Sequence, residues 1–374
     1  MRRLLLITLL ALNTFSWAYT PSENAKLSIL TCSSGAEVYK IYGHTAIRFQ
    51  DSNIDMVYNY GMFSFDEPHF FIRFVRGYNY YLLGRESYRN FESRYKRGGE
   101  TVTEQTLNLS HEELKIVFDA LETNAKPENR KYLYNVFYDN CATRVYKILE
   151  KQIPGGIIWD NECPEASFRD LIHEYNGQMP FSQMGIDVVF SIKADKNTTF
   201  YEQMFLPEKL MRELDTAQKG DNTPLISETK TLITGRPIHT KNKSQTFILT
   251  LSALCLLTML IRFKFAKALR AYRIIIFSLL GLTSIVVSFI AFCSIHPTVL
   301  PNINLIWINP FWLIVAGVFI CKKQPANFWQ KLLNVWAIII TIFLICGCCG
   351  LFYLNPYLIG LLPTIIITNY KRIF

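Results

Sequence analysis

The chain has 374 residues and a formal net charge of +9, but its charge is unevenly distributed. No Asp or Glu follows Glu228, whereas 14 of the 39 Lys and Arg residues do, which leaves 25 basic against 30 acidic side chains in the first 228 residues. A net-negative first part is a poor electrostatic partner for phosphates, so the composition argues against nucleic-acid binding.

The N-terminus has the pattern of a secretory signal peptide. Arg2 and Arg3 precede the apolar run LLLITLLAL, and Ser16-Trp17-Ala18 places small residues where a signal peptidase reads them. An apolar core of this length, followed by a cleavage site, is typical of a signal peptide. We expect residues 1–18 to be removed on export, and an uncleaved anchor helix is the alternative.

Residues 19–214 are expected to form one exported domain of mixed α and β structure. Alternating apolar residues predict strands, and residues 51–53 (DSN) between two of them have the composition of a tight turn. Ser110 and Glu113 form a capping-box pattern that predicts a helix from 111 to about 123. The predicted strands are KLSILTC, YGHTAIRFQ, DMVYNYGMF and TVTEQTLNL.

The segment 62–83 is unusually rich in Phe and Tyr. Such side chains fit an acyl groove or the headgroup layer of a membrane. A packed aromatic core is the alternative and the commoner arrangement.

Beyond this domain the composition changes. Residues 215–243 are polar and rich in Thr and Lys, and are expected to be a linker. Residues 244–374 contain five apolar stretches, each near the ~20 residues that a helix needs to cross a bilayer core, although the last is short. We therefore predict an all-α transmembrane bundle of five helices, at about 244–261, 274–295, 303–320, 332–354 and 356–369.

The loops between these stretches predict the orientation of the bundle. Residues 262–273 hold five basic side chains and no acid, 321–331 and the C-terminal tail are also basic, and SIHPTVLPN and LNPY carry no Lys or Arg. Basic loops stay on the cytoplasmic side of a membrane. We expect a multi-pass protein of the bacterial inner membrane with its N-terminal domain in the periplasm and its C-terminus in the cytoplasm. Because the spans lack acidic residues, we expect the chemistry in the exported domain.

Cys141 is the candidate nucleophile. Asn140 is a good helix N-cap, and apolar residues recur at helical spacing from Cys141 to the PGG at 154–156, so the sulfur is expected in the first turn of a helix. Backbone N–H groups and the helix dipole at that position lower a thiol pKa and favour the reactive thiolate. A disulfide is the alternative, because Cys32 and Cys163 are also exported.

His44 is the strongest candidate for the base that such a nucleophile needs. Gly43 allows close backbone approach, and the TAIRF that follows predicts a strand. A histidine on a strand that faces a helix N-terminus carrying a cysteine is the arrangement of papain-like enzymes. If residues 52–53 form a two-residue hairpin loop, Asn59 falls near Ala46 on the face that carries His44, where its amide can orient the imidazole.

The order of these residues, His44 almost 100 positions before Cys141, resembles the circularly permuted NlpC/P60 group that includes lecithin:retinol acyltransferase-like enzymes. The longer pattern is similar to the Lnb-type lipoprotein N-acyltransferases of Bacteroidetes, from about residue 26 to 215, and the multi-span C-terminal part is similar to that family as well. The stretches that carry the resemblance are LTCSSGAEVYKIYGHTAIRF, VYNYGMFSF, YNVFYDNCATR, MGIDVV and EQMFLPEKL.

This resemblance implies a fold class and a reaction. The fold class is an α+β papain-like exported domain of the circularly permuted NlpC/P60 type, followed by an all-α transmembrane bundle. The implied enzyme is an acyltransferase: Cys141 takes an acyl chain from a membrane phospholipid and passes it, with His44 as base, to the N-terminal cysteine α-amine of a diacylated lipoprotein. No metal or diffusible cofactor is implied.

Two other functions stay open. A cysteine peptidase or amidase acting on cell-wall peptides would use the same residues without a lipid. A non-catalytic assembly partner of another exported enzyme would give Cys141 a structural role, such as a disulfide with Cys32 or Cys163.

Overall fold

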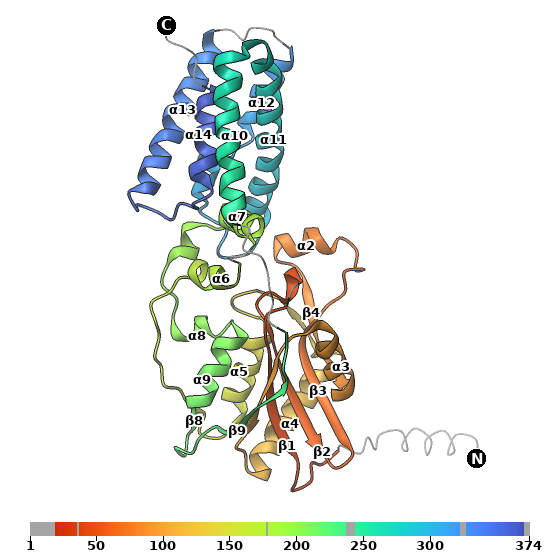
Figure 1. The fold of residues 1–374 in the computed structure, drawn as a ribbon. Helices are drawn as coiled ribbons and strands as arrows, with labels where there is room; N and C mark the ends of the chain where they lie inside the picture. Colours follow the sequence, from red (N-terminus) through yellow and green to blue (C-terminus); the bar gives the residue numbers. More distant parts are fainter. Residues whose placement is uncertain (1–18, 36, 177–178, 237–243, 322–326, 370–374) are drawn as a thin grey trace, which may run out of the picture.

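The computed structural model of this chain describes residues 19–35, 37–176, 179–236, 244–321 and 327–369. The expected signal peptide therefore lies outside the described residues. Figure 1 shows two parts, one above the other: a domain built on a β-sheet, and a bundle of long helices.

The described residues of the first part form a sheet of seven strands in the order β6-β4-β3-β2-β1-β5-β9, with every neighbouring pair antiparallel. These strands are β1 (Lys26–Cys32), β2 (His44–Asp51), β3 (Ile54–Met62), β4 (Tyr80–Ser87), β5 (Val102–Leu107), β6 (Lys131–Leu133) and β9 (Ile226–Ile233). The four strands predicted from alternation are confirmed as β1, β2, β3 and β5. Asp51 pairs with Ile54, so residues 52–53 form the expected hairpin loop.

Helices cover both faces of the sheet. They are α3 (Tyr88–Gly98), α4 (His111–Ala125), α5 (Cys141–Gln152) and α9 (Pro207–Thr216). Ile29 of β1 belongs to one buried cluster with Val145 and Leu149 of α5, whereas Leu30 belongs to another with Phe91 of α3. Each fully buried apolar side chain of this size contributes about 1.5–3 kcal/mol, so both clusters hold the helices firmly on the sheet.

The strand β9 corrects the expected linker over 215–243. Residues 226–233 fall inside that stretch, yet they pair with β5 at the edge of the sheet. Most of β9 is exposed and only Ile233 is buried. Its polar composition therefore reflects an edge strand with solvated side chains rather than a linker. The sheet domain extends to residue 233, and residues 237–243 lie outside the described part of the chain.

Shorter elements complete the domain. They are η1 (Val38–Lys40), β7 (Ile157–Ile158), η2 (Ile192–Asp195), α8 (Phe200–Gln203) and β8 (Gln218–Lys219). β7 and β8 pair with each other in a separate two-stranded ladder.

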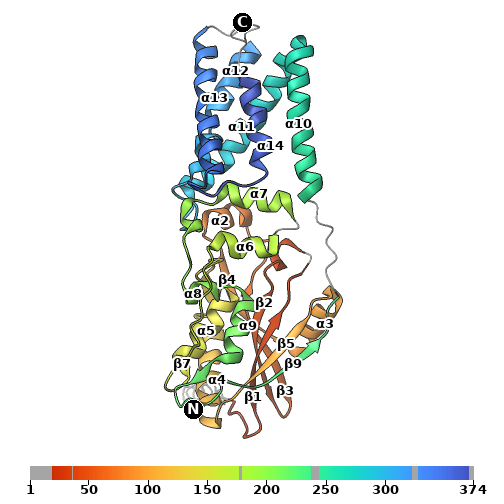
Figure 2. The ribbon, with the colours of Figure 1, turned by 60° about the vertical axis from the view of Figure 1, so that its left-hand side comes forward.

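Three helices lie between the sheet domain and the bundle in both ribbon views (Figures 1 and 2). They are α2 (Phe70–Arg76), α6 (Phe168–Asn176) and α7 (Pro180–Val189). The buried carboxylate of Asp187 accepts a hydrogen bond from Arg169 at 2.6 Å and another from Asn355 of the bundle at 2.6 Å, and Nε2 of His173 lies 2.9 Å from it. A buried charge with partners on both sides is costly to break, at about 3–5 kcal/mol, so this junction fixes the domain on the bundle.

The bundle is made of α10 (Ser244–Lys264), α11 (Ala266–Cys293), α12 (Phe311–Cys321), α13 (Asn327–Cys348) and α14 (Leu358–Asn369), with η3 (Ile303–Ile306) before α12. Among the described residues, three segments are long and apolar enough to cross a membrane: Ala268–Cys293, Ile303–Cys321 and Asn327–Cys348. Thr246–Arg262 and Leu358–Thr368 are shorter apolar helices. Three spans are thus supported by length and composition, and a crossing by all five stays a prediction.

Candidate active site

Cys141 is the first residue of α5, and the residue before it holds it there. Asn140 accepts a hydrogen bond from the Thr143 N–H at 2.9 Å, and its own N–H donates to the Thr143 hydroxyl at 2.7 Å. The Asn140 amide also donates to the carbonyls of Val136 and Phe205, both at 2.8 Å. This reciprocal cap satisfies backbone groups at the helix start and anchors it to two other segments, so the thiol has a fixed position.

The surroundings of Cys141 favour its thiolate. Burial raises the pKa of the thiol. The charge and hydrogen bond of His44 and the backbone N–H groups of Thr45 and Ala142 lower it by a larger amount, so the pKa of Cys141 is below the ordinary thiol value. Opposite charge and hydrogen bonds to the charged form both stabilise that form. N–H groups this close to the sulfur are candidate donors to the oxyanion that forms when the sulfur attacks a carbonyl.

Asn59 holds the imidazole of His44. Nε2 of His44 lies 2.6 Å from Oδ1 of Asn59. The strand register explains this contact, because the pairing of Ile47 with Tyr58 places Asn59 on the face of the sheet that His44 shares. The structure therefore brings together the three residues that the sequence singles out, Cys141, His44 and Asn59.

Glu86 sets the orientation of the Asn59 amide. Nδ2 of Asn59 donates to Glu86 at 3.0 Å, and Arg94 donates to the same carboxylate with both terminal nitrogens, at 2.6 and 2.9 Å. An ionised carboxylate can only accept, so the amide oxygen of Asn59 must face His44. Neutral His44 then carries its proton on Nε2, and Nδ1 is left to take the proton of Cys141.

The pKa of His44 is raised. Burial lowers the pKa of the imidazole, but the negative charge and hydrogen bond of Cys141 and the hydrogen bond to Asn59 raise it by more. With the lowered pKa of Cys141, this favours a thiolate–imidazolium pair, which titrates as one coupled unit.

The sequence alone did not identify Glu86 and Arg94 as parts of the site. β4 follows β3 only after a long connection, and the register between the two strands shifts between Tyr60 and Met62, so the neighbour of Asn59 cannot be counted along the chain. The available signal was a carboxylate at an alternate position of the strand YYLLGRES.

Asn59→Ala is expected to slow any reaction in which Cys141 is the nucleophile by up to about 100-fold, because the imidazole of His44 loses the partner that orients it. The pH profile for alkylation of Cys141 by iodoacetamide should also move to higher pH, since the hydrogen bond that raises the pKa of His44 is lost. Asn90→Ala, at an exposed position of α3, is the matched control. A lower melting temperature with an unmoved pH profile would show that Asn59 is only structural.

The other cysteines of the domain do not pair with Cys141. Cys32, Cys141 and Cys163 are all free thiols. Cys32 is buried, and burial raises the pKa of its thiol, whereas Cys163 is exposed. Within the described residues, no group of three or more His, Cys, Asp or Glu side chains is placed to hold a metal ion.

An exposed aromatic surface lies where the sheet domain meets the bundle. Phe71 and Phe74 of α2 are 70% and 37% exposed, and the carbonyl of Arg76 at the end of α2 accepts a hydrogen bond from the Ile295 N–H at 3.0 Å. Phe70 is buried, so the segment 62–83 is part core and part exposed surface. Clusters of exposed apolar side chains mark interaction sites. We define the aromatic surface as Phe65, Phe71, Ile72, Phe74 and Tyr78.

Two family models match this chain. The model described as the Lnb N-terminal periplasmic domain matches residues 14–174, and the model described as the Lnb transmembrane domain matches residues 243–373. No curated protein and no solved structure matches the chain. The two matched segments together cover most of the chain and include parts of both the sheet domain and the helix bundle. The chain therefore belongs to the Lnb family, as a membrane protein with a periplasmic N-terminal domain.

Proposed function

We propose that this protein is a membrane-bound lipoprotein N-acyltransferase that moves an acyl chain from a phospholipid to the N-terminal cysteine α-amine of a diacylated lipoprotein. Membership of the Lnb family points to an enzyme of lipoprotein maturation. The proposal of N-acyl transfer rests on the line of interactions from Cys141 through His44 to Asn59, on a domain docked to membrane helices.

The first half-reaction forms a thioester. The Cys141 thiolate attacks the ester carbonyl of a phospholipid, and the N–H groups of Thr45 and Ala142 stabilise the oxyanion. The imidazolium of His44 gives its proton to the departing alkoxide, which leaves as a lysophospholipid. Cys141 now carries the acyl chain, and His44 is neutral.

The second half-reaction passes the acyl chain to the lipoprotein. The α-amine of the S-diacylglyceryl cysteine attacks the thioester carbonyl, and His44 takes the proton that the amine loses. The Cys141 thiolate leaves as the amide forms, which restores the thiolate–imidazolium pair. Neither half-reaction requires a metal or a diffusible cofactor.

The fold and the orientation in the membrane are part of this proposal. A cysteine at the start of α5, packed against a strand that carries the base, supports a circularly permuted papain-like domain. α11 contacts α2 through its C-terminal end, so its basic N-terminal end lies about 40 Å away by helix length. Basic residues at the end remote from the sheet domain support an inner-membrane protein with its C-terminus in the cytoplasm.

The aromatic surface supports a lipid donor. Its side chains sit at the end of the bundle that meets the sheet domain, which is the level of the outer leaflet in this orientation. Exposed Phe and Tyr side chains are favourable at a membrane interface.

The proposal is tested with the full-length protein in vesicles of phospholipid with an isotope-labelled acyl chain. Added diacylated lipopeptide should gain one labelled acyl group in amide linkage, detected by mass spectrometry. If the lipopeptide stays unchanged while the same preparation cleaves cell-wall peptides, the protein is a peptidase or amidase instead.

A further inference from the structure

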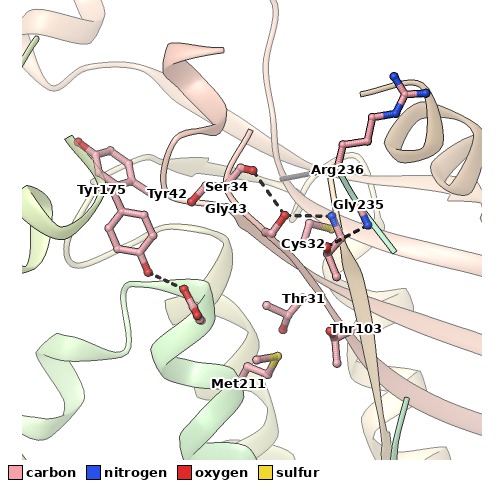
Figure 3. A pocket seen from close by; sticks show the side chains of 13 residues that line it. Thr31, Cys32, Ser34, Tyr42, Gly43, Thr103, Tyr175, Met211, Gly235 and Arg236 are labelled. Atoms are coloured by element: carbon pink, nitrogen blue, oxygen red, sulfur yellow. Dashed lines mark hydrogen bonds between the residues drawn. The ribbon is translucent and has the colours of Figure 1, made fainter. Parts of the chain in front are cut away.

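A pocket of about 510 Å³ lies beside the ends of β1 and β5 (Figure 3). Its volume is within the range of about 300–1,000 Å³ that is common for ligand sites. Figure 3 shows Thr31 and Thr103 side by side on neighbouring strands, with Met211 of α9 near them and Tyr42 and Tyr175 farther along the wall. Aliphatic hydroxyl groups in the wall come from Thr31, Ser33, Ser34, Thr101 and Thr103, and phenolic ones from Tyr42 and Tyr175.

One of these hydroxyls is buried and unsatisfied. Thr31 is 6% exposed, and its Oγ1 atom has no hydrogen-bond partner within the described part of the chain. Oγ1 of Thr45, on the next strand, is also buried and also lacks a hydrogen-bond partner within the described residues. A buried hydroxyl without a partner is unfavourable for the folded protein, so a bound peptide that displaces the atoms covering Oγ1 of Thr31 would gain a hydrogen bond there.

A row of paired threonines connects this pocket with the thiol of Cys141. Thr103 pairs with Thr31, and Thr31 pairs with Thr45, so the three threonines form a row across β5, β1 and β2 on one face of the sheet. The backbone N–H of Thr45, at the end of that row, bonds to the Cys141 sulfur. Since neighbouring strands are about 4.8 Å apart, the pocket lies on the order of 10 Å from the nucleophile.

The sheet also places the pocket and the aromatic surface on opposite sides of the nucleophile. α2 belongs to the connection between β3 and β4, on one side of β2, whereas the pocket lies at β1 and β5, on the other. Two substrates of different character can therefore approach Cys141 from different directions.

The wall carries one acidic and one basic side chain, and a balance of this kind suits an uncharged polar chain. Glu208 contributes a carboxylate, which accepts hydrogen bonds from Tyr175 and Arg212, both at 3.2 Å, so its charge is already paired with Arg212. Arg236 is the single cation among the described wall residues. Hydroxyl groups at the ends of two strands match the alternating N–H and C=O groups of a peptide backbone.

We propose that this pocket holds the polypeptide segment that follows the lipidated cysteine of the acceptor lipoprotein. The assignment rests on the acyltransferase function proposed above. It separates the two substrates: the phospholipid reaches Cys141 from the aromatic surface, and the acceptor chain reaches it along the threonine row.

The test uses the double variant Thr31→Val, Thr103→Val in full-length protein reconstituted with phospholipid. Valine keeps the shape of threonine, and the Thr31 hydroxyl has no hydrogen-bond partner to lose, so the fold should stay intact, which thermal unfolding checks. Thr106→Val, the same change on β5 but outside the pocket, is the control. Ser34→Trp, at the pocket wall, is a second variant that acts by filling space.

Two synthetic acceptors are compared: a diacylglyceryl-cysteine lipopeptide with a long peptide tail, and a diacylglyceryl-cysteine amide without one. Wild-type protein should prefer the long acceptor in kcat/KM, and both pocket variants should reduce that preference about threefold to tenfold. Transfer to the short acceptor should not change. Equal use of both acceptors by wild-type protein, or an unchanged preference in both variants, would overturn the proposal.

Acylation of Cys141 by phospholipid without any acceptor is measured on the same preparations. If it falls in the pocket variants, the pocket serves the donor headgroup and the proposal is wrong. If wild-type protein shows no acylation of Cys141 at all, it is the proposed function that fails.

Discussion

Cys141→Ser is expected to abolish N-acylation of lipoproteins, with activity reduced by more than about 1,000-fold. A serine hydroxyl has a far higher pKa than a thiol, so the charge of His44 and the N–H groups of Thr45 and Ala142 cannot ionise it at neutral pH. The measurement is mass spectrometry of lipoprotein N-terminal peptides from cells that carry only the variant copy. The peptides should lack the amide-linked acyl chain and keep the diacylglyceryl group.

Cys163→Ser is the matched control for this experiment. Cys163 is a free, exposed thiol in the same domain, so its replacement should leave N-acylation at the wild-type level. Persisting N-acylation in Cys141→Ser cells that have no other transferase would contradict the role of Cys141.

His44→Gln is expected to lower the rate of transfer by about 100- to 10,000-fold, because the reaction loses both its base and the charge that ionises the thiol. His111→Gln, at the start of α4, is the control. If His44→Gln kept a rate near that of wild-type protein, another group would have to be the base.

The same variant gives a pH prediction for Cys141. In wild-type protein the lowered pKa of the thiol keeps Cys141 ionised below the ordinary thiol range, and this ionisation is lost as the pH falls through the lowered pKa. Without the imidazole, burial still raises the pKa of the thiol, so alkylation by iodoacetamide should need a higher pH in His44→Gln. Identical alkylation profiles would mean that His44 does not interact with Cys141.

The parts of the site that could be predicted are those fixed by local chain geometry. Asn140 caps α5 through contacts within three residues, so the position of Cys141 followed from the sequence. The two-residue loop between β2 and β3 fixes the register of the hairpin, which is why Asn59 could be placed beside His44 by counting. A slip of one residue would have turned Asn59 to the other face.

The parts that could not be predicted depend on contacts between distant segments. Glu86 reaches Asn59 only after β4 has returned from the long connection that contains α2. β9 has a polar, exposed composition, so nothing local distinguishes it from a linker until β5 is known to lack a neighbour on that side. Asp187 resembles a surface carboxylate in the sequence, yet it is buried by partners from α6 and the bundle.

The acyl-thioester on Cys141 is tested most directly by the intact mass of the full-length protein after incubation with phospholipid vesicles and no acceptor. The expected result is a gain equal to one acyl chain, located on Cys141, removed by hydroxylamine as a thioester would be, and lost when diacylated lipopeptide is added. An unchanged mass, or an acyl group on another residue that the lipopeptide does not remove, would contradict it.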